Sequence, residues 1–231
     1  VGGAILLDLD QDPMQPVELG IFDDYYLHDG MARGDSLWGS HVYQGYQSYI
    51  DVTDKANPAL LANWNTPNNF THNCWISDDN NYIFTTDETS GAYITSYDVS
   101  DINNVYELDR IQSNPGSGVI PHNTHYINGY IVTSYYRDGV TIHDVSRPAN
   151  MIEVGNYDSY SQGSGDGFNG DWGAYPWLPS GNVIISDIEN GLFILGATYV
   201  RGCYLEGTIT DQATGNAIGS ATVELVSTTA S

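Results

Sequence analysis

The feature that most constrains this chain is an internal repeat of 43 to 47 residues. Four segments begin with glycine and continue with a short apolar strand that ends in aspartate. The strand-ending aspartates are Asp8, Asp51, Asp98 and Asp144, at spacings of 43, 47 and 46 residues. A repeat of about 40–50 residues that holds several short strands is typical of β-propeller blades.

A second shared stretch lies between these elements and supplies two more strands to each unit. It contains a polar turn, such as Asn80-Asn81 or Asn128-Gly129, followed by an apolar strand such as 130–134. Helical periodicity does not persist anywhere in the first 195 residues. We therefore predict an all-β chain whose residues 1–198 form a β-propeller of four-stranded blades. The propeller is incomplete in this chain, with about four and a half blades.

Residues 199–231 change character. They read as a strand, a turn at Thr214-Gly215 and a second strand. About 30 residues hold too few strands to close a sandwich core. We predict that this segment is a partial β-sandwich, the start of a second domain.

Two motifs carry a resemblance to known families. The segments 4–8 (AILLD) and 140–144 (VTIHD) resemble the LVIVD repeat, and residues 1–195 resemble the choice-of-anchor B family of bacterial surface proteins. Residues 205–225 resemble the opening of the carboxypeptidase regulatory-like domain. The resemblance implies propeller blades and an extracellular or cell-surface location, whereas the family has no defined activity to transfer. The fourth inner strand departs from the pattern because Trp172 stands where the other units have histidine.

The two ends of the chain leave sheet edges open, since they do not supply complementary halves of one blade. Two explanations are open. The chain is a segment of a longer protein, or neighbouring chains fill the edges and form an oligomer or fibre by strand exchange.

The charge balance narrows the range of partners. The chain has 29 Asp+Glu against 6 Lys+Arg, a net charge of −23. Nucleic acid and anionic membranes are excluded as partners by this charge, whereas cations are attracted. No stretch approaches the ~20 apolar residues of a membrane span. Cys74 and Cys203 either pair in an oxidising compartment or stay free, with Cys74 buried in its apolar run.

Three histidines recur at one place in the repeat. His28, His72 and His122 are each followed by Asp or Asn. One interpretation is a ring of imidazoles near the propeller axis that binds a metal. The other, favoured because scaffold residues repeat and active sites are usually asymmetric, is that each histidine fixes its blade through hydrogen bonds to backbone.

The strand-ending aspartates are also expected to be structural. We expect Asp51, Asp98 and Asp144 to accept hydrogen bonds from the turn that follows each strand, as in Asx-turns.

Two groups of side chains are candidate ligands for calcium. Carboxylates alternate in the first repeat, and a glycine-rich insert at 163–172 has no counterpart in the other units. The candidate ligands are Asp8, Asp10 and Asp12 in the first group and Asp166, Asn169 and Asp171 in the second. In both places a plain solvated loop or turn is the alternative.

Other candidate sites are aromatic or short motifs. Trp172, Tyr175 and Trp177 form the expected exposed patch for stacking on a glycan. Asn69 fits the N-glycosylation sequon, and Ser36 lies in a short pattern that resembles a bacterial O-glycosylation motif.

No nucleophile, zinc-protease or phosphate-binding motif occurs in the sequence. We therefore predict a non-enzymatic scaffold or adhesion protein, extracellular or surface-anchored, that self-assembles through strand exchange. The alternatives are a glycan-binding module and a carboxylate-dependent hydrolase that acts at the mouth of the propeller.

Overall fold

The computed structural model describes residues 2–224, which form seventeen strands in five antiparallel sheets and no helix. Within each sheet, strands adjacent in sequence are adjacent in space. The two-stranded sheet consists of β1 (Ala4–Asp8) and β2 (Val17–Phe22). The first four-stranded sheet consists of β3 (Asp29–Arg33), β4 (Ser36–His41), β5 (Tyr46–Asp51) and β6 (Ala59–Asn65).

Two more sheets have four strands and the last has three. The second four-stranded sheet consists of β7 (Thr71–Ile76), β8 (Tyr82–Asp87), β9 (Ile94–Asp98) and β10 (Tyr106–Ile111). The third consists of β11 (Thr124–Ile127), β12 (Tyr130–Ser134), β13 (Val140–Asp144) and β14 (Ile152–Tyr157). The three-stranded sheet consists of β15 (Asp171–Tyr175), β16 (Asn182–Asp187) and β17 (Gly191–Gly196).

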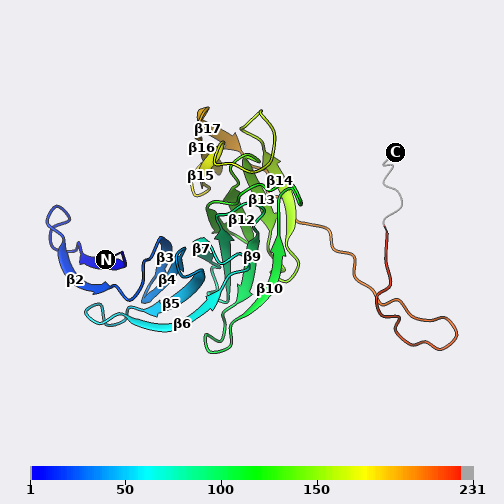
Figure 1. Cartoon of the computed structure of the whole chain (residues 1–231), viewed down its shortest axis with the longest axis horizontal. Coiled ribbons are helices and arrows are strands. Elements are labelled where there is room, and N and C mark those ends of the chain that lie inside the picture. The colour runs from blue at the N-terminus through cyan, green and yellow to red at the C-terminus, as the bar shows by residue number, and fades with distance from the viewer. Residues whose placement is uncertain (1, 225–231) are drawn as a thin grey trace.

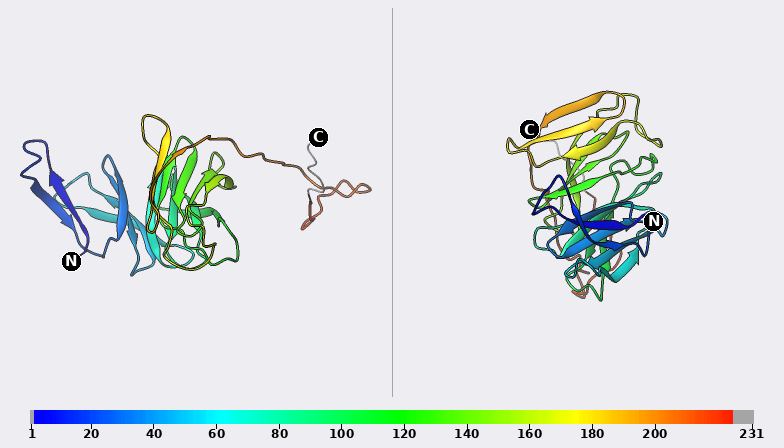
Figure 2. Two further views of the ribbon diagram at one scale, coloured as in Figure 1. Left: turned by 90° about the horizontal axis from the view of Figure 1, so that it is seen from above. Right: turned by 90° about the vertical axis from the view of Figure 1, so that its left-hand side faces the viewer.

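The sheets follow one another in chain order along an arc, with the two-stranded sheet at one end and the three-stranded sheet at the other (Figures 1 and 2). The prediction of an all-β propeller with four-stranded blades is confirmed. The first strands of successive blades, β3, β7, β11 and β15, contact one another. These four strands therefore lie nearest the propeller axis.

A hydrophobic core fills each gap between neighbouring blades. Ile83 and Cys74 belong to the core between the β3–β6 and β7–β10 blades, and Phe84 and Ile131 to the core between β7–β10 and β11–β14. Smaller cores join the two end sheets to the rest. Because adjacent residues on the middle strands face different gaps, Ile83 and Phe84 of β8 serve two cores. This explains why the middle strands are apolar on both faces.

The repeat glycines have a conformational reason. Gly139 lies in the turn before β13 with φ of +72°, and a Cβ there would lie 2.1 Å from the carbonyl oxygen of Tyr157. The corresponding Gly45, Gly91 and Gly191 also have positive φ, where glycine carries no steric penalty. Each of these four glycines thus sets the turn into the third strand of its blade.

Beyond β17 the chain first follows the β11–β14 blade and then leaves it. The Tyr199 ring lies 5.0 Å from that of Tyr130, and the Arg201 guanidinium lies 2.9 Å from the carboxylate of Asp144. The backbone N–H of Gly202 donates to the same carboxylate at 2.7 Å. Glu206 pairs with Arg147 of the same blade, and the residues after it run away from the sheets, with one isolated bridge between Thr210 and Ala217 (Figure 1).

The division into residues 1–198 and 199–231 stays a prediction, and its last part, 225–231, lies outside the described residues. Within residues 2–224, no helix has the length and apolar character that a membrane crossing requires.

Candidate functional site

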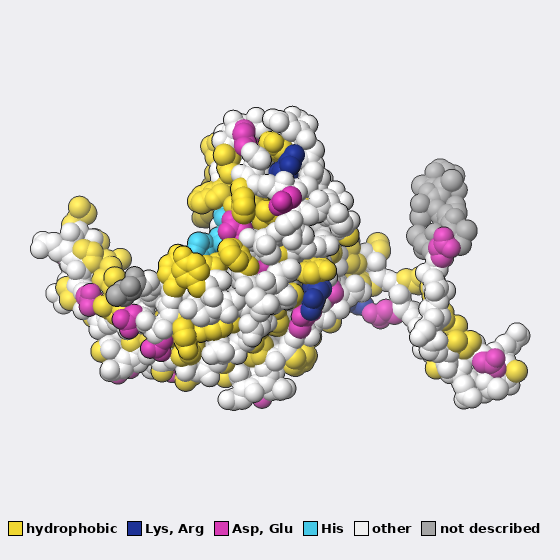
Figure 3. Space-filling model, viewed as in Figure 1, with side chains coloured by type: hydrophobic (Ala, Val, Ile, Leu, Met, Phe, Trp, Pro, Cys, Tyr) yellow, Lys and Arg dark blue, Asp and Glu magenta, His cyan; other side chains and the backbone are white. Residues whose placement is uncertain are grey.

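The repeated histidines lie together at one end of the innermost strands. His28 directly precedes β3, His72 is the second residue of β7, and His122 lies just before β11. The imidazole centroids of His28 and His72 are 4.5 Å apart, and those of His72 and His122 are 4.4 Å apart. Trp172, which replaces histidine in the last blade, continues the row, with its ring 5.3 Å from that of His122. The histidine side chains emerge on the concave side of the arc (Figure 3).

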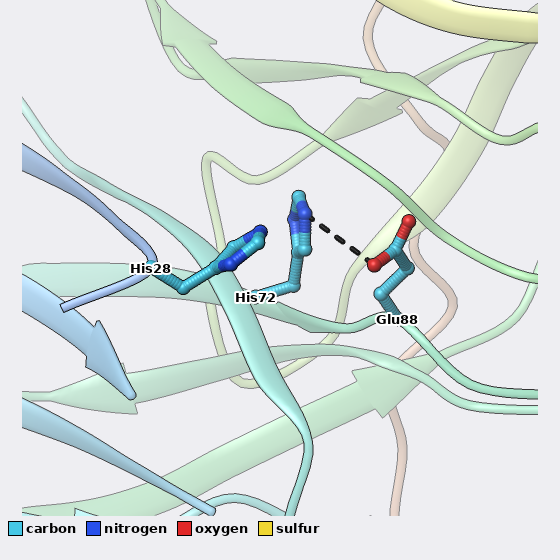
Figure 4. A group of neighbouring side chains, drawn as sticks. All are labelled: His28, His72 and Glu88. Atoms are coloured by element: carbon cyan, nitrogen blue, oxygen red, sulfur yellow. Dashed lines mark ion pairs between the residues drawn. The ribbon is translucent and has the colours of Figure 1, made fainter. Parts of the chain in front are cut away.

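A carboxylate that the sequence analysis did not single out completes this cluster. Glu88 directly follows β8, and its Oε2 lies 3.5 Å from Nε2 of His72. Its Oε1 lies 3.6 Å from Nε2 of His122 and accepts a hydrogen bond of 2.6 Å from the hydroxyl of Tyr136. Figure 4 shows the side chains of His28, His72 and Glu88 facing one space. We call His28, His72, Glu88 and His122 the axial cluster.

A signal for Glu88 is present in the repeat. The residue three positions before each repeat glycine is Val42, Glu88, Tyr136 or Ile188. Glu88 is the only charged residue at this position of the repeat, and Tyr136, its hydrogen-bond partner, occupies the same position in the next blade. Comparing the blades position by position therefore finds Glu88 and Tyr136, whereas a search for repeated residues misses them.

Burial controls the protonation of the axial cluster. The pKa of His72 is lowered to about 3, chiefly by burial and also by the neighbouring His122 and His28. Burial also lowers the pKa of His122 to about 4. The pKa of Glu88 is raised by burial, against the hydrogen bond from Tyr136, which lowers it. His72 and His122 are therefore neutral near pH 7, and Glu88 is a stronger base than an exposed glutamate.

A hydrogen bond sets the tautomer of His122. Its Nδ1 contacts the carbonyl oxygen of Trp172, which only accepts hydrogen bonds, so Nδ1 carries the proton of the neutral ring. The lone pair of Nε2 then faces Glu88. His72 has no hydrogen-bond partner for Nδ1 although the side chain is buried. His122, by contrast, is fixed through its ring to the backbone of the next blade.

Aromatic rings surround the open side of the axial cluster. His28 is exposed, and its Nδ1 lies 3.2 Å from the hydroxyl of Tyr26, whose ring centroid lies 4.8 Å from that of Tyr43. On the other side, Phe168 packs edge-on against Tyr136 at 5.3 Å. Tyr43 and Phe168 are 78% and 58% exposed, and Trp172 is 54% exposed. The cluster is thus buried at His72 and open to solvent at His28.

The three candidate glycan-binding aromatics do not form one patch. Trp172 lies at the axial cluster, whereas Trp177 stacks on Trp75 of another blade, with centroids 4.7 Å apart. Tyr175 packs edge-on against Trp177 and is 48% exposed. His125 also lies against Trp75 and Trp177, at 4.9 and 5.0 Å, away from the other three histidines of the inner strands.

The candidate calcium ligands of the insert differ in their surroundings. Asp171 is fully buried at the start of β15, without a hydrogen-bond partner for either carboxylate oxygen. Asn169 donates a hydrogen bond of 2.6 Å to Glu189. Asp166 is held through its backbone carbonyl, which accepts a hydrogen bond of 2.8 Å from Arg137. A calcium site at these residues stays a prediction.

The candidate ligands of the first repeat lie in turns. Asp8 accepts a hydrogen bond of 2.8 Å from the N–H of Asp10, and Asp12 accepts one of 3.0 Å from that of Met14. Among the described residues, the set that brings three His, Cys, Asp or Glu ligand atoms within 4.8 Å of one another is His28, His72 and Glu88.

The strand-ending aspartates cap the turns that follow them. Asp51, Asp98 and Asp144 accept hydrogen bonds of 2.8 to 2.9 Å from the N–H two residues further on. This is the geometry of Asx-turns. Their recurrence is thus explained by the turn.

The remaining candidate residues lie away from the axis. Asn69 is exposed, with φ of +53°, and Ser36 begins β4, its hydroxyl 3.3 Å from that of Tyr49. Their glycosylation stays a prediction. Cys74 is buried and Cys203 exposed, and both are free thiols.

Comparison with known proteins gives structural neighbours only. No protein family matches the sequence, and no curated protein matches it either. A periplasmic gluconolactonase of Pseudomonas aeruginosa is similar in structure, with a TM-score of 0.63 at 10% identity, over 93% of this chain and 61% of that one. Two proteins described as candidate 6-phosphogluconolactonases, from Bacteroides uniformis and Bacteroides fragilis, have TM-scores of 0.65 and 0.63 at 13% and 15% identity, over 94% of this chain and 63% of each.

These neighbours establish the propeller fold. This chain spans about three fifths of their length. The LVIVD, choice-of-anchor B and carboxypeptidase regulatory-like resemblances have no match among the families.

The neighbours also correct the functional prediction. They carry the names of lactone-hydrolysing enzymes, which contradicts the expected non-enzymatic scaffold or adhesion protein and favours the hydrolase alternative. The prediction rested on repeated residues, and Glu88, which does not repeat, did not enter it.

Proposed function

We propose that this chain carries the active-site part of an extracytoplasmic hydrolase that opens lactones, with the axial cluster as its catalytic centre. The observation that carries the proposal is the position of Glu88. This partly buried carboxylate faces two neutral imidazoles and a tyrosine hydroxyl, at the solvent-accessible end of the innermost strands. The names of the structural neighbours support lactones as the substrate class, and one neighbour is named as periplasmic.

Lactone hydrolysis needs a base that removes a proton from water and an acid that protonates the leaving oxygen. In the proposed reaction, Glu88 accepts a proton from a water molecule as the water oxygen bonds to the lactone carbonyl carbon. The ring C–O bond then breaks, and the protonated Glu88 returns its proton to the leaving oxygen. The product is the open hydroxy acid, and Glu88 is again a carboxylate.

The neighbouring groups prepare Glu88 for this role. Burial raises the pKa of Glu88, which brings a carboxylate closer to the value that suits a base near neutral pH. The hydroxyl of Tyr136 fixes one carboxylate oxygen and leaves the other toward His72. The exposed rings of Tyr43, Phe168 and Trp172 offer apolar faces on which the C–H face of a sugar lactone stacks.

The test is acid release from D-glucono-δ-lactone and from a neutral lactone, measured with a pH indicator against the spontaneous rate. The matched pair is Glu88→Gln and Glu18→Gln, since Glu18 is exposed on β2 at the far end of the arc. We expect Glu88→Gln to lower kcat/KM by about 10²–10⁴-fold, the usual contribution of a general base. Glu18→Gln should match the unmodified chain. Hydrolysis no faster than the spontaneous rate, or full activity in Glu88→Gln, would refute the proposal.

A further inference from the structure

The negative charge of Glu88 is not balanced by the other residues of the axial cluster. Glu88 is 16% exposed, and the groups that contact its carboxylate are Tyr136 and the neutral His72 and His122. No Lys or Arg among residues 2–224 forms an ion pair with it. Buried charges in proteins are normally paired or coordinate metal ions. Glu88 therefore lacks a cation.

The orientation of His122 adds a second unfavourable interaction at the carboxylate of Glu88. Because Nδ1 of His122 donates to the carbonyl of Trp172, the unprotonated Nε2 faces Oε1 of Glu88 at 3.6 Å. Two lone pairs that face each other at this distance repel unless a positive group lies between them. A metal ion relieves the repulsion, and the hydrogen bond to Trp172 is the kind of contact that orients histidine ligands.

We propose that the axial cluster binds one divalent transition-metal ion of the zinc class, through His28, His72 and Glu88. Their ligand atoms all lie within 4.8 Å of one another (Figure 4). Zinc bonds of about 2.0–2.2 Å place tetrahedral ligand atoms roughly 3.4 Å apart, so the side chains close by about 1 Å around the ion. His28 is exposed and free to make this movement, and Nε2 of His122 is a fourth donor.

The ligand types select the metal. Imidazole nitrogen with a single carboxylate suits zinc, iron, cobalt or nickel, whereas calcium and magnesium prefer sites made of oxygen alone. The side chain of His72 is buried, and its Nδ1 has no hydrogen-bond partner among the described residues. The net charge of −23 also favours the approach of a cation.

As a binding site, the cluster stands independently of the reaction. As an active-site cofactor, the ion rests on the proposed lactone hydrolysis. In that case Glu88 is a ligand, and the ion lowers the pKa of the water bound to it. The two roles of Glu88, as base and as metal ligand, differ in one measurable property. A chelator abolishes lactone hydrolysis only where Glu88 is a ligand of a catalytic metal ion.

The experiment measures zinc binding directly, on the 231-residue chain prepared without a polyhistidine tag. Calorimetric titration with ZnCl₂ gives affinity and stoichiometry, CaCl₂ gives the comparison, and absorption of the Co²⁺ complex reports imidazole coordination. We expect one Zn²⁺ per chain and much weaker binding of Ca²⁺. His28→Ala is the first variant, because an exposed residue is removed without disturbing the core.

His28→Ala and Glu88→Gln should each weaken zinc binding by at least roughly 10–100-fold. That is the loss seen when only the hydrogen-bond partner of a metal ligand is removed. His125→Gln and Glu18→Gln are the matched controls and should bind as the unmodified chain does. Absence of stoichiometric zinc binding, or unchanged affinity in His28→Ala and Glu88→Gln, would overturn the metal site.

The two proposals fail in different ways. Zinc binding without lactone hydrolysis would refute the proposed function and leave the metal site standing. Hydrolysis that persists after dialysis against EDTA, in a chain that binds no zinc, would refute the metal site and leave Glu88 as the base.

Discussion

Asp171 is buried in a way that should make the chain less stable as pH rises. It begins β15, pairs in register with Asp187 of β16, and has no hydrogen-bond partner for its carboxylate oxygens. In the β7–β10 blade the corresponding pair is Thr71 and Asp87. Burial raises the pKa of Asp171 from 3.8 to about 8, and the charge of Asp187 adds to the shift. The folded chain therefore holds a protonated Asp171 near neutral pH.

The sign and size of the effect follow from linkage. Between pH 3.8 and about 8 the folded chain binds a proton at Asp171 that the unfolded chain releases. The free energy of unfolding therefore falls through this window as pH rises, and the loss from this group is complete above pH 8. Each pH unit is worth about 1.4 kcal/mol, so the loss at pH 7 is at most about 4 kcal/mol. Asp171→Asn removes the ionisable group at nearly constant volume.

We expect Asp171→Asn to be about 2–4 kcal/mol more stable than the unmodified chain at pH 7, since relaxation reduces the full value. At pH 4 the two should agree within about 1 kcal/mol, because pH 4 lies only just above 3.8, the pKa of the unfolded carboxyl, and little of the loss has yet accumulated. Urea unfolding between pH 4 and pH 8 gives both curves, and other titrating groups cancel in their difference. Asp23→Asn, at an exposed position, is the control for replacing a carboxylate by an amide. Parallel curves for Asp171→Asn, or a loss of stability at pH 7, would show that Asp171 is ionised and paired.

Three further predictions follow from other contacts. Tyr136→Phe removes the hydrogen bond that lowers the pKa of Glu88, so the acid limb of the kcat/KM profile should move to higher pH in initial-rate measurements. An unchanged acid limb would show that it does not report the ionisation of Glu88. Ile83→Ala, at a fully buried position, should cost about 2–5 kcal/mol in urea unfolding, and a loss under 1 kcal/mol would mean that the core collapses around the gap. Arg201→Ala removes the ion pair with Asp144 and two hydrogen bonds to backbone carbonyls, so limited proteolysis near residue 201 should accelerate while Tm stays within a few degrees; unchanged proteolysis would show that the ion pair does not hold this segment.

The blade structure could be read from the sequence because each blade repeats the same local signals. Gly139 requires positive φ, Asp144 caps a turn, and Asn128-Gly129 closes a hairpin, and all three act within a few residues of themselves. Such signals need no knowledge of distant contacts. The order of strands within a blade then follows from short connections alone.

The chemistry of the site depends on contacts between blades, which the repeat does not specify. Glu88 gains its role from His72, His122 and Tyr136, and the last two lie in the next blade along the arc. Similarly, the sequence presents Asp171 as one more acid in a glycine-rich loop. Its burial appears only when β15 is paired with β16.

The row of histidines carries a consequence for how such a site can originate. When a blade is duplicated, the new copy already carries a histidine near the axis. Several imidazole nitrogens therefore gather there without selection for any chemistry. What must then be acquired is a difference between copies. Here two positions supply it, Glu88 on one side of the row and Trp172 at its end. Specialisation in this chain amounts to breaking the equivalence of the blades, at two different positions of the repeat.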